Sequence, residues 1–136
     1  MIYLGTDIIN INRIRNNLID NRIKFLNKVF NQQEIEYCSS KSDPAIHFAG
    51  RFAAKEAVKK AILSAGVLKQ ISIKNIGIIS FGGIPKVSIQ DILYSQKDNV
   101  NIKKNPSYAI EVSISHTDDM ASATAILTHF PIAINE

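Results

Sequence analysis

Alternating apolar and polar residues predict two strands in the second half of the chain, over residues 108–115 and 121–127, with a turn at residues 116–119 between them. An apolar segment over residues 2–9 predicts a strand near the start of the chain. The Ile-rich run 71–80 predicts another strand, and a Gly-Gly turn then leads into a partner strand over 85–89. The second half is therefore expected to be mostly strand.

The first half has the spacing of helices. Asn10 or Asn12 would cap a short helix, and a second short apolar segment covers residues 25–30. Asn31, with Glu34 three positions later, has the pattern of a capping box and predicts a third short helix.

A long helix is predicted after a polar turn at residues 39–43. Asp43 is placed as its N-cap and Pro44 at its first position, and Gly66 is placed just beyond its end near Ser64. Apolar residues cover too much of its circumference for a surface helix. We therefore expect this helix at the centre of the fold.

A short helix over residues 89–96, a polar loop over 97–107 and a loose tail over 129–136 complete the prediction. There is no repeat or linker, so the 136 residues are expected to form a single domain, residues 1–136. The expected fold class is α+β, with a mostly antiparallel sheet packed around the long central helix. A composition of 46% hydrophobic and 21% charged residues argues against long disordered segments.

The net charge of +4 and a pI near 9.2 favour an anionic partner. Nucleic acid, an acidic protein and a phosphorylated small molecule all qualify. A single cysteine, Cys38, excludes an internal disulfide and fits a reducing compartment. The start of the chain has no basic segment typical of a signal peptide, and no apolar run approaches the roughly 20 residues of a membrane span. We expect a cytoplasmic protein.

The segment Phe52 to Lys60 of the long helix carries its most informative charges. At roughly 100° per residue, Lys55, Glu56, Lys59, Lys60 and Phe52 fall within an arc of about 140°. A carboxylate in an apolar stripe is costly unless a cation or hydrogen bonds satisfy it. A carboxylate with a basic rim suits a metal and a phosphorylated ligand. The same residues also fit an ordinary solvated face, with Glu56 and Lys60 as an i,i+4 pair.

Asp7 and Glu56 together would suit Mg²⁺, which prefers a few carboxylates, retained waters and phosphate oxygens. An exposed Asp7 is the alternative. No Cys/His cluster supports zinc. His116 follows a strand that ends in hydroxyl residues and precedes Thr117, so it is either a ligand-binding residue at a strand end or a turn histidine.

The first helical region is strongly basic and contains one acidic residue, Asp20. It is either a solvated face or a docking surface for an acidic protein. Its basic residues are Arg13, Arg15, Arg22, Lys24 and Lys28.

Three segments resemble motifs of the holo-acyl-carrier-protein synthases, the short branch of the 4′-phosphopantetheinyl transferases. Gly5-Thr6-Asp7-Ile8 is similar to the N-terminal Gly-x-Asp strand of that family. Arg51 to Ala57, RFAAKEA, with Lys60 is similar to its signature helix, and Ser113 to Thr117, SISHT, to its penultimate-strand motif. The order and spacing agree over nearly the whole chain, to about Leu127.

The resemblance implies a reaction. The 4′-phosphopantetheine arm of coenzyme A would move to a serine of apo-acyl carrier protein for fatty acid biosynthesis, releasing adenosine 3′,5′-bisphosphate. Asp7 and Glu56 match the acids that hold Mg²⁺, Lys60 matches a phosphate-binding lysine, and these three form the expected catalytic set. The residue that takes the serine proton is left open; a metal-bound water and Glu56 are both candidates.

The resemblance also implies contacts and assembly. Coenzyme A is expected to contact Arg51, Lys55, Lys60, Gly66, Pro85, His116 and Thr117. Acyl carrier protein is expected to dock on Arg13, Arg15, Arg22 and Lys24. A homotrimer with sites at subunit interfaces is implied, with neither membrane nor nucleic acid as a partner.

Two turns depart from the family pattern. The turn Leu63-Ser64-Ala65-Gly66 has one residue more than the usual Gly-Thr-Gly turn, and Gly83-Ile84-Pro85 lacks the usual lysine, for which Lys86 is a possible substitute. Both departures lie near the expected nucleotide.

Two other functions fit part of this pattern. A hot-dog thioesterase module would also bind coenzyme A, but it would not explain paired Asp7 and Glu56. A small basic RNA-binding protein would need aromatic residues among the basic ones on a sheet face, and the predicted strands offer few.

Overall fold

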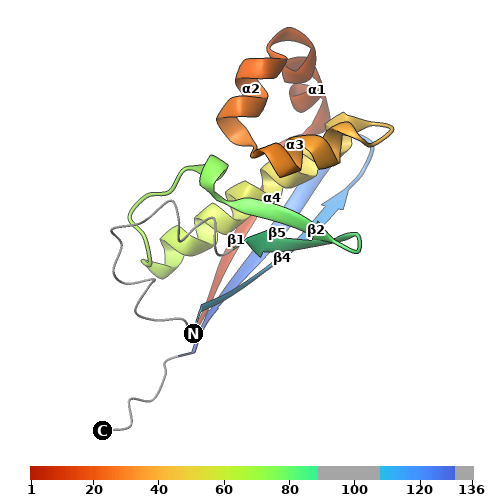
Figure 1. The fold of residues 1–136 in the computed structure, drawn as a ribbon. Coiled ribbons are helices and arrows are strands. Elements are labelled where there is room, and N and C mark those ends of the chain that lie inside the picture. Colours follow the sequence, from red (N-terminus) through yellow and green to blue (C-terminus); the bar gives the residue numbers. More distant parts are fainter. Residues whose placement is uncertain (89–107, 131–136) are drawn as a thin grey trace, which may run out of the picture.

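The computed structural model describes residues 1–88 and 108–130 of the chain. Three strands, β1 (Ile2–Asn10), β5 (Met120–His129) and β4 (Tyr108–His116), form an antiparallel sheet in the order β1-β5-β4. A separate hairpin pairs β2 (Gly77–Phe81) with β3 (Ile84–Ser88). The long helix α4 (Pro44–Ala65) lies between this hairpin and the sheet (Figure 1). The predicted α+β class and the central position of the long helix are confirmed.

Three short helices cover the end of the molecule at which β1 leads into α1, at the top of Figure 1. They are α1 (Ile11–Asp20), α2 (Arg22–Val29) and α3 (Gln32–Ser39). The side chain of Asn10 accepts a hydrogen bond from the backbone of Asn12 and caps α1. The predicted capping box of α3 is present, with both of its hydrogen bonds between Asn31 and Glu34.

The core is built on small residues where α4 meets the sheet. Fully buried alanines line both surfaces, and strand alternation places those of β5 on the face toward α4. These alanines are Ala49, Ala53, Ala57 and Ala61 on α4 and Ala121, Ala123 and Ala125 on β5. Small side chains let the backbones of helix and sheet approach closely, so a site built across this contact has little freedom to shift.

Some boundaries differ from the sequence prediction. The strand predicted over 71–80 begins only at Gly77, because residues 73–75 form a short 3₁₀ helix (η1, Ile73–Asn75). The isoleucines that suggested a strand, such as Ile71 and Ile76, are instead buried as anchors of an irregular segment. His116 and His129 end strands rather than lying in a turn or tail. The helix predicted over 89–96, the loop over 97–107 and most of the predicted tail lie outside the described residues.

None of the helices in the described residues is both long and apolar enough to cross a bilayer.

Candidate functional site

Gly5 is the point of closest contact between β1 and α4. A Cβ atom there would lie 1.8 Å from the carbonyl oxygen of Ala57 and 2.8 Å from the backbone nitrogen of Ala61. No side chain fits at these distances, so glycine is required for packing rather than for an unusual backbone angle. Asp7, two residues later on the same face of β1, is thereby brought beside α4.

Asp7 is bound by Lys60 of α4. The Nζ atom of Lys60 lies 3.3 Å from Asp7 Oδ1 and donates to the carbonyl oxygen of Thr6 at 2.9 Å. The Asp7 side chain is 17% exposed and that of Lys60 54%. Glu56 lies one helical turn before Lys60 on the same side of α4 and is half-buried. We call Asp7, Glu56 and Lys60 the carboxylate site.

The carboxylate site offers the donors that Mg²⁺ prefers. Asp7 is a mostly buried carboxylate whose ion-pair partner, Lys60, is half-exposed. In the described part of the chain, no group of three or more His, Cys, Asp or Glu side chains is arranged to hold a metal. Two carboxylates leave most of the coordination shell to water and ligand oxygens, which suits a Mg²⁺ bound together with a phosphorylated substrate rather than a structural ion.

A second group of side chains surrounds Tyr37 of α3. The guanidinium carbon of Arg51 lies 4.2 Å from the centre of the Tyr37 ring, and Lys41 Nζ lies 4.5 Å from it. The His47 ring meets Tyr37 edge-on, with centroids 6.2 Å apart. We call Tyr37, Lys41, His47 and Arg51 the basic cluster. Neither Tyr37 nor His47 belongs to a sequence motif that marks it as functional, although Arg51 follows His47 by one turn of the same helix.

Positive charge accumulates in the basic cluster. Burial lowers the pKa of His47, and the neighbouring charges of Arg51, Lys41 and His116 lower it further. The pKa of Tyr37 is also lowered, chiefly by a side-chain hydrogen bond with Ser80 of β2. Arg51 is buried, and its Nε atom has no hydrogen-bond partner among the described residues. An anion placed here would relieve the repulsion among these cations.

His116 ends β4 on the side of the sheet that faces α4, and its charge influences His47. The turn that follows is held by Thr117, whose Oγ1 accepts hydrogen bonds from the backbone nitrogens of Asp119 and Met120 at 3.2 and 3.1 Å. The imidazole Nδ1 of His116 lies 3.3 Å from the carbonyl oxygen of Thr117. The predicted strand-end histidine therefore lies beside the basic cluster.

The carboxylate site and the basic cluster lie on different sides of α4. From Arg51, Glu56 is about 140° and Lys60 about 180° around the helix. Arg51 packs on Tyr37 of α3, whereas Lys60 reaches β1 (Figure 1). One chain therefore does not bring its two candidate half-sites together.

The sequence predicted that Lys55 shares one basic rim with the other lysines beside Glu56, and this prediction is wrong. The side chain of Lys55 is fully buried and pairs with Glu34 of α3. The helical wheel gave its direction correctly, but it could not show that α3 covers that side of α4. Lys55 consequently does not share the exposed edge of Lys60.

The remaining predicted contact residues lie at the ends of these elements. Gly66 caps α4 in the left-handed conformation, with φ of 70°, as predicted. Pro85 pairs with Ser80 in the β2–β3 hairpin. Lys86, the possible substitute for the missing lysine, pairs with Glu111 of β4 at 3.1 Å.

Cys38 is fully buried, and burial, as the largest influence, raises the pKa of its thiol to about 12. At neutral pH the thiol is protonated, so it is not a nucleophile.

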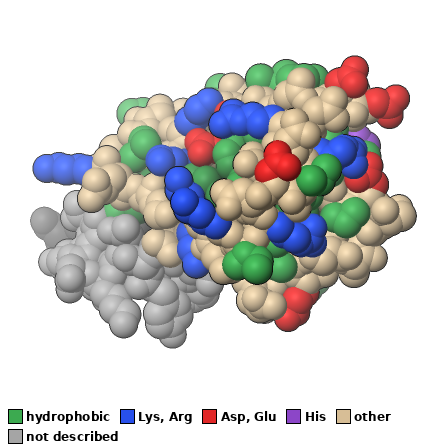
Figure 2. Space-filling view, turned by 90° about the horizontal axis from the view of Figure 1, so that it is seen from above, with side chains coloured by type: hydrophobic (Ala, Val, Ile, Leu, Met, Phe, Trp, Pro, Cys, Tyr) green, Lys and Arg blue, Asp and Glu red, His purple; other side chains and the backbone are tan. Residues whose placement is uncertain are grey.

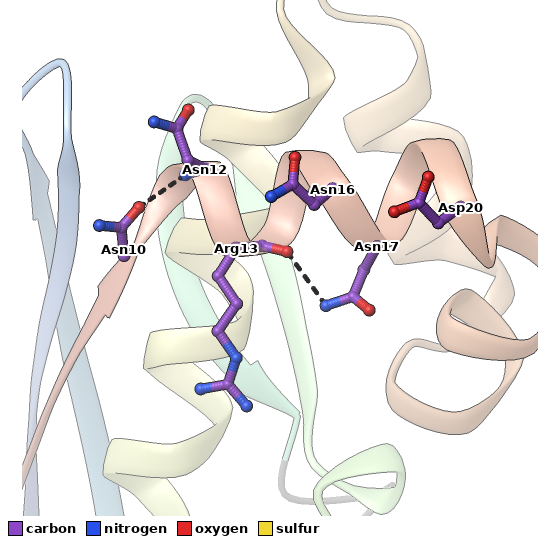
Figure 3. A pocket seen from close by; sticks show the side chains of 6 residues that line it. All are labelled: Asn10, Asn12, Arg13, Asn16, Asn17 and Asp20. Carbon is purple, nitrogen blue, oxygen red and sulfur yellow. Dashed lines mark hydrogen bonds between the residues drawn. The ribbon is translucent and has the colours of Figure 1, made fainter.

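The basic surface predicted on the first helices is only partly available. Arg13 is exposed and lines an open groove on α1 (Figure 3), and Arg22 and Lys24 are exposed on α2. Arg15, in contrast, is held by Asp43 through two hydrogen bonds of 2.9 and 3.2 Å, which tie α1 to the start of α4. The other groove residues are Asn10, Asn12, Asn16, Asn17 and Asp20.

Hydrophobic side chains lie among these cations. In the view from the α1–α2 end, Lys and Arg side chains are interspersed with hydrophobic ones (Figure 2). Ile19 and Ile23 are 74% and 78% exposed. A surface that mixes positive charge with exposed apolar groups suits a protein partner better than a purely ionic one.

The family model for the 4′-phosphopantetheinyl transferase superfamily matches residues 3–125. The chain belongs to this superfamily. The match includes the carboxylate site, the basic cluster and the His116 turn, so the resemblance inferred from the three sequence motifs is confirmed.

Individual members are similar over nearly their whole length. The holo-[acyl-carrier-protein] synthase of Chlamydia pneumoniae is 39% identical over 126 residues, covering 93% of this chain and 96% of the relative. That of Chlamydia muridarum is 42% identical over 126 residues, covering 93% and 94%.

Solved structures agree in fold. A Helicobacter pylori holo-[acyl-carrier-protein] synthase in complex with coenzyme A has a TM-score of 0.71 at 28% identity, covering 92% of this chain and 99% of that one. An ACPS–CoA complex from Chronobacterium ammoniagenes has a TM-score of 0.77 at 23% identity, covering 96% and 99%, and supports the fold alone.

Proposed function

We propose that this transferase moves the 4′-phosphopantetheine arm of coenzyme A to a serine of apo-acyl carrier protein, in the cytoplasm and for fatty acid biosynthesis. The products are holo-acyl carrier protein and adenosine 3′,5′-bisphosphate. Relatives that share about 40% of their residues over nearly the whole chain are named holo-[acyl-carrier-protein] synthase. The thioesterase and RNA-binding alternatives are not favoured, because the family match extends over residues 3–125.

The observation that carries this proposal is the contact of Asp7 with Lys60 beside Glu56. Phosphoryl transfer depends mainly on positioning and on neutralising charge. Asp7 and Glu56 would hold Mg²⁺, which when bound supplies positive charge next to the diphosphate of coenzyme A. Lys60 is half-exposed, so its ammonium group is free to turn from Asp7 to a phosphate oxygen.

The basic cluster supports binding of the other end of the nucleotide. Arg51 and His116 would hold the 3′-phosphate, and the hydroxyl of Thr117, which accepts two backbone hydrogen bonds, keeps its own proton to donate. Stacking on Tyr37 fixes the plane of the Arg51 guanidinium. The orientation of coenzyme A would then be set by two contacts: its 3′-phosphate would bind the basic cluster, and its diphosphate would bind at the carboxylate site.

The site is proposed to form between subunits of a homotrimer. The two half-sites lie on different sides of α4, so nucleotide contacts from one chain would meet the carboxylates of a neighbour. The outer face of the sheet carries apolar residues that a partner would cover: Ile2, Leu4, Ile8 and Ile126, each 40–68% exposed. Leu4 and Ile126 are paired across β1 and β5, so part of this surface is continuous.

Mass spectrometry tests the reaction. Apo-carrier protein incubated with coenzyme A, Mg²⁺ and the enzyme should gain the mass of one phosphopantetheine group. A carrier protein with its acceptor serine replaced by alanine is the matched control and should gain nothing. An unmodified carrier under these conditions would contradict the proposed function.

Subunit mixing tests the shared site. Asp7→Ala and His116→Ala chains should each be inactive alone, and reassembled mixtures should recover activity, because some interfaces then combine intact halves. Light scattering should give about three times the 15.1 kDa chain mass. A fully active monomer, or mixtures that stay inactive although they assemble, would refute the shared site.

A further inference from the structure

Glu34 joins three elements of the fold in the core. It is 2% exposed, and its Oε1 atom accepts hydrogen bonds from the backbone nitrogen of Asn31, at 2.9 Å, and from the ammonium group of Lys55 on α4. Its Oε2 atom accepts from the backbone nitrogen of Ile78 on β2 at 2.9 Å. One carboxylate therefore links α3, α4 and the β2–β3 hairpin.

The same three elements also meet around Tyr37, about one helical turn away from the Glu34–Lys55 pair. Tyr37 follows Glu34 by one turn of α3, and Arg51 precedes Lys55 by one turn of α4. Ser80, which hydrogen-bonds with Tyr37, lies two residues after Ile78 on β2. Each element that Glu34 binds thus contributes one residue to the group around the Arg51 guanidinium: Tyr37 from α3, Arg51 itself from α4 and Ser80 from β2.

We propose that the buried Glu34–Lys55 pair is a positioning device that fixes Arg51 for the 3′-phosphate of the nucleotide. This inference rests on the proposed function, in which Arg51 binds that phosphate. Lys55 itself does not contact the ligand, because its side chain is fully buried within its own chain.

An ion pair suits this role better than an apolar contact. Apolar side chains tolerate small sliding of one helix on another, whereas charge-assisted hydrogen bonds are directional. Breaking a buried pair by removing one partner leaves an uncompensated charge, while replacing both partners is often tolerated. Phe30 also faces the Lys55 ammonium, with 5.4 Å between Nζ and the ring centre, so the charge is confined on two sides.

The test distinguishes an effect of the Glu34–Lys55 pair on Arg51 from an effect of the pair on the stability of the whole fold. Glu34→Gln combined with Lys55→Met removes both charges at similar volume and keeps one side-chain acceptor for a backbone N–H group, so this double variant should fold. The matched control is Gln32→Met with Glu36→Gln, which removes an exposed side-chain hydrogen bond of 3.2 Å on α3. Circular dichroism and thermal melting verify the fold of each.

The measured quantity is the preference for a 3′-phosphate in calorimetric titrations of adenosine 3′,5′-bisphosphate and adenosine 5′-monophosphate. Wild type should prefer the bisphosphate, and the double variant should lose about tenfold of that preference, because Arg51 no longer aligns its charged hydrogen bonds. The control should keep the wild-type preference. A purely structural pair would weaken both ligands equally.

A folded double variant with the wild-type preference would overturn the proposal. If the double variant does not fold, Glu34→Asp takes its place: it keeps the charge but shortens the side chain, and an unchanged preference in that variant would overturn the proposal equally. A wild-type protein with no preference for the bisphosphate would also overturn it. Because binding needs no turnover, a wild type that prefers the bisphosphate and a double variant that loses this preference would support this inference even if no transfer occurred. The absence of transfer would then contradict the proposed function alone.

Discussion

Gly5→Ala should damage both the stability and the activity of the enzyme. The added methyl group would lie 1.8 Å from the carbonyl oxygen of Ala57, whereas ordinary contacts begin at 3.4 Å. The strand must therefore withdraw by the difference, about 1.6 Å, or α4 must move by as much. Both neighbouring atoms belong to the backbone of α4, so no side chain can rotate away.

The expected cost follows from this geometry. Overpacking in a well-filled core typically costs about 1–3 kcal/mol, and a backbone clash on a rigid helix belongs at or above the upper end of that range. Withdrawal of β1 also moves Asp7 away from Glu56 and Lys60. Misplacement of a catalytic group by about 1 Å reduces rates by about a hundredfold.

Urea denaturation at matched chain concentration and the rate of carrier modification measure the two effects. Gly50→Ala is the control, since the one close contact of its methyl group among the described residues, at 3.0 Å, is with a side-chain methyl of Ile114 rather than with backbone. In α4 that change also gains about 1 kcal/mol of helix propensity, so a net effect near zero is expected. If Gly5→Ala matched Gly50→Ala in both assays, the close strand–helix contact would not position the site.

Three further results are expected. Asp7→Asn should nearly abolish transfer while leaving the fold intact, and the residual activity of this variant should no longer depend on Mg²⁺. Full activity of the wild-type enzyme in the presence of a chelator would exclude the metal from the mechanism. Arg13→Glu should raise the KM for carrier protein severalfold, more strongly at low salt, and should change the KM for coenzyme A little. Lys28→Glu should raise the KM for carrier protein less. If the KM of the Arg13→Glu variant for carrier protein did not depend on salt, the docking surface would lie elsewhere. The pKa of His47 is lowered in the folded state, so the unfolded chain binds more protons as the pH falls through about 6.5 and stability is lost there. His47→Phe should reduce this loss in melting curves between about pH 7.5 and 5.5, and an unchanged pH dependence would refute the assignment.

Local signals in the sequence were sufficient for most elements. The capping box at Asn31 and Glu34, the Pro44 start and the Gly66 end of α4 depend on neighbouring residues, and all are present. The strand predicted over 71–80 failed over its first part because buried isoleucines mark burial, not conformation.

The candidate site was predictable only where it follows a recognisable motif. Asp7 and Lys60 are in contact, because Gly5 and the alanines of α4 allow β1 to pack closely on that helix. The roles assigned to these two residues and to Glu56 stay predictions. The second role of Glu34 was not predictable, since its partner Lys55 is 21 positions away in sequence and no local pattern connects them. The position of Tyr37 in the basic cluster was not predictable for the same reason, because its neighbours belong to α4 and β2.

The pairing of β1 with β5 has a consequence for biosynthesis. Ile2 lies opposite Thr128, 126 positions later, so β1 leaves the ribosome long before β5, the strand with which it forms its hydrogen bonds. Such distant contacts slow folding and leave the apolar edge of a nascent strand open to other chains in the meantime. A premature stop within β5 would therefore do more than shorten the protein, because it would deprive β1 of its partner and direct the product toward chaperones or proteolysis.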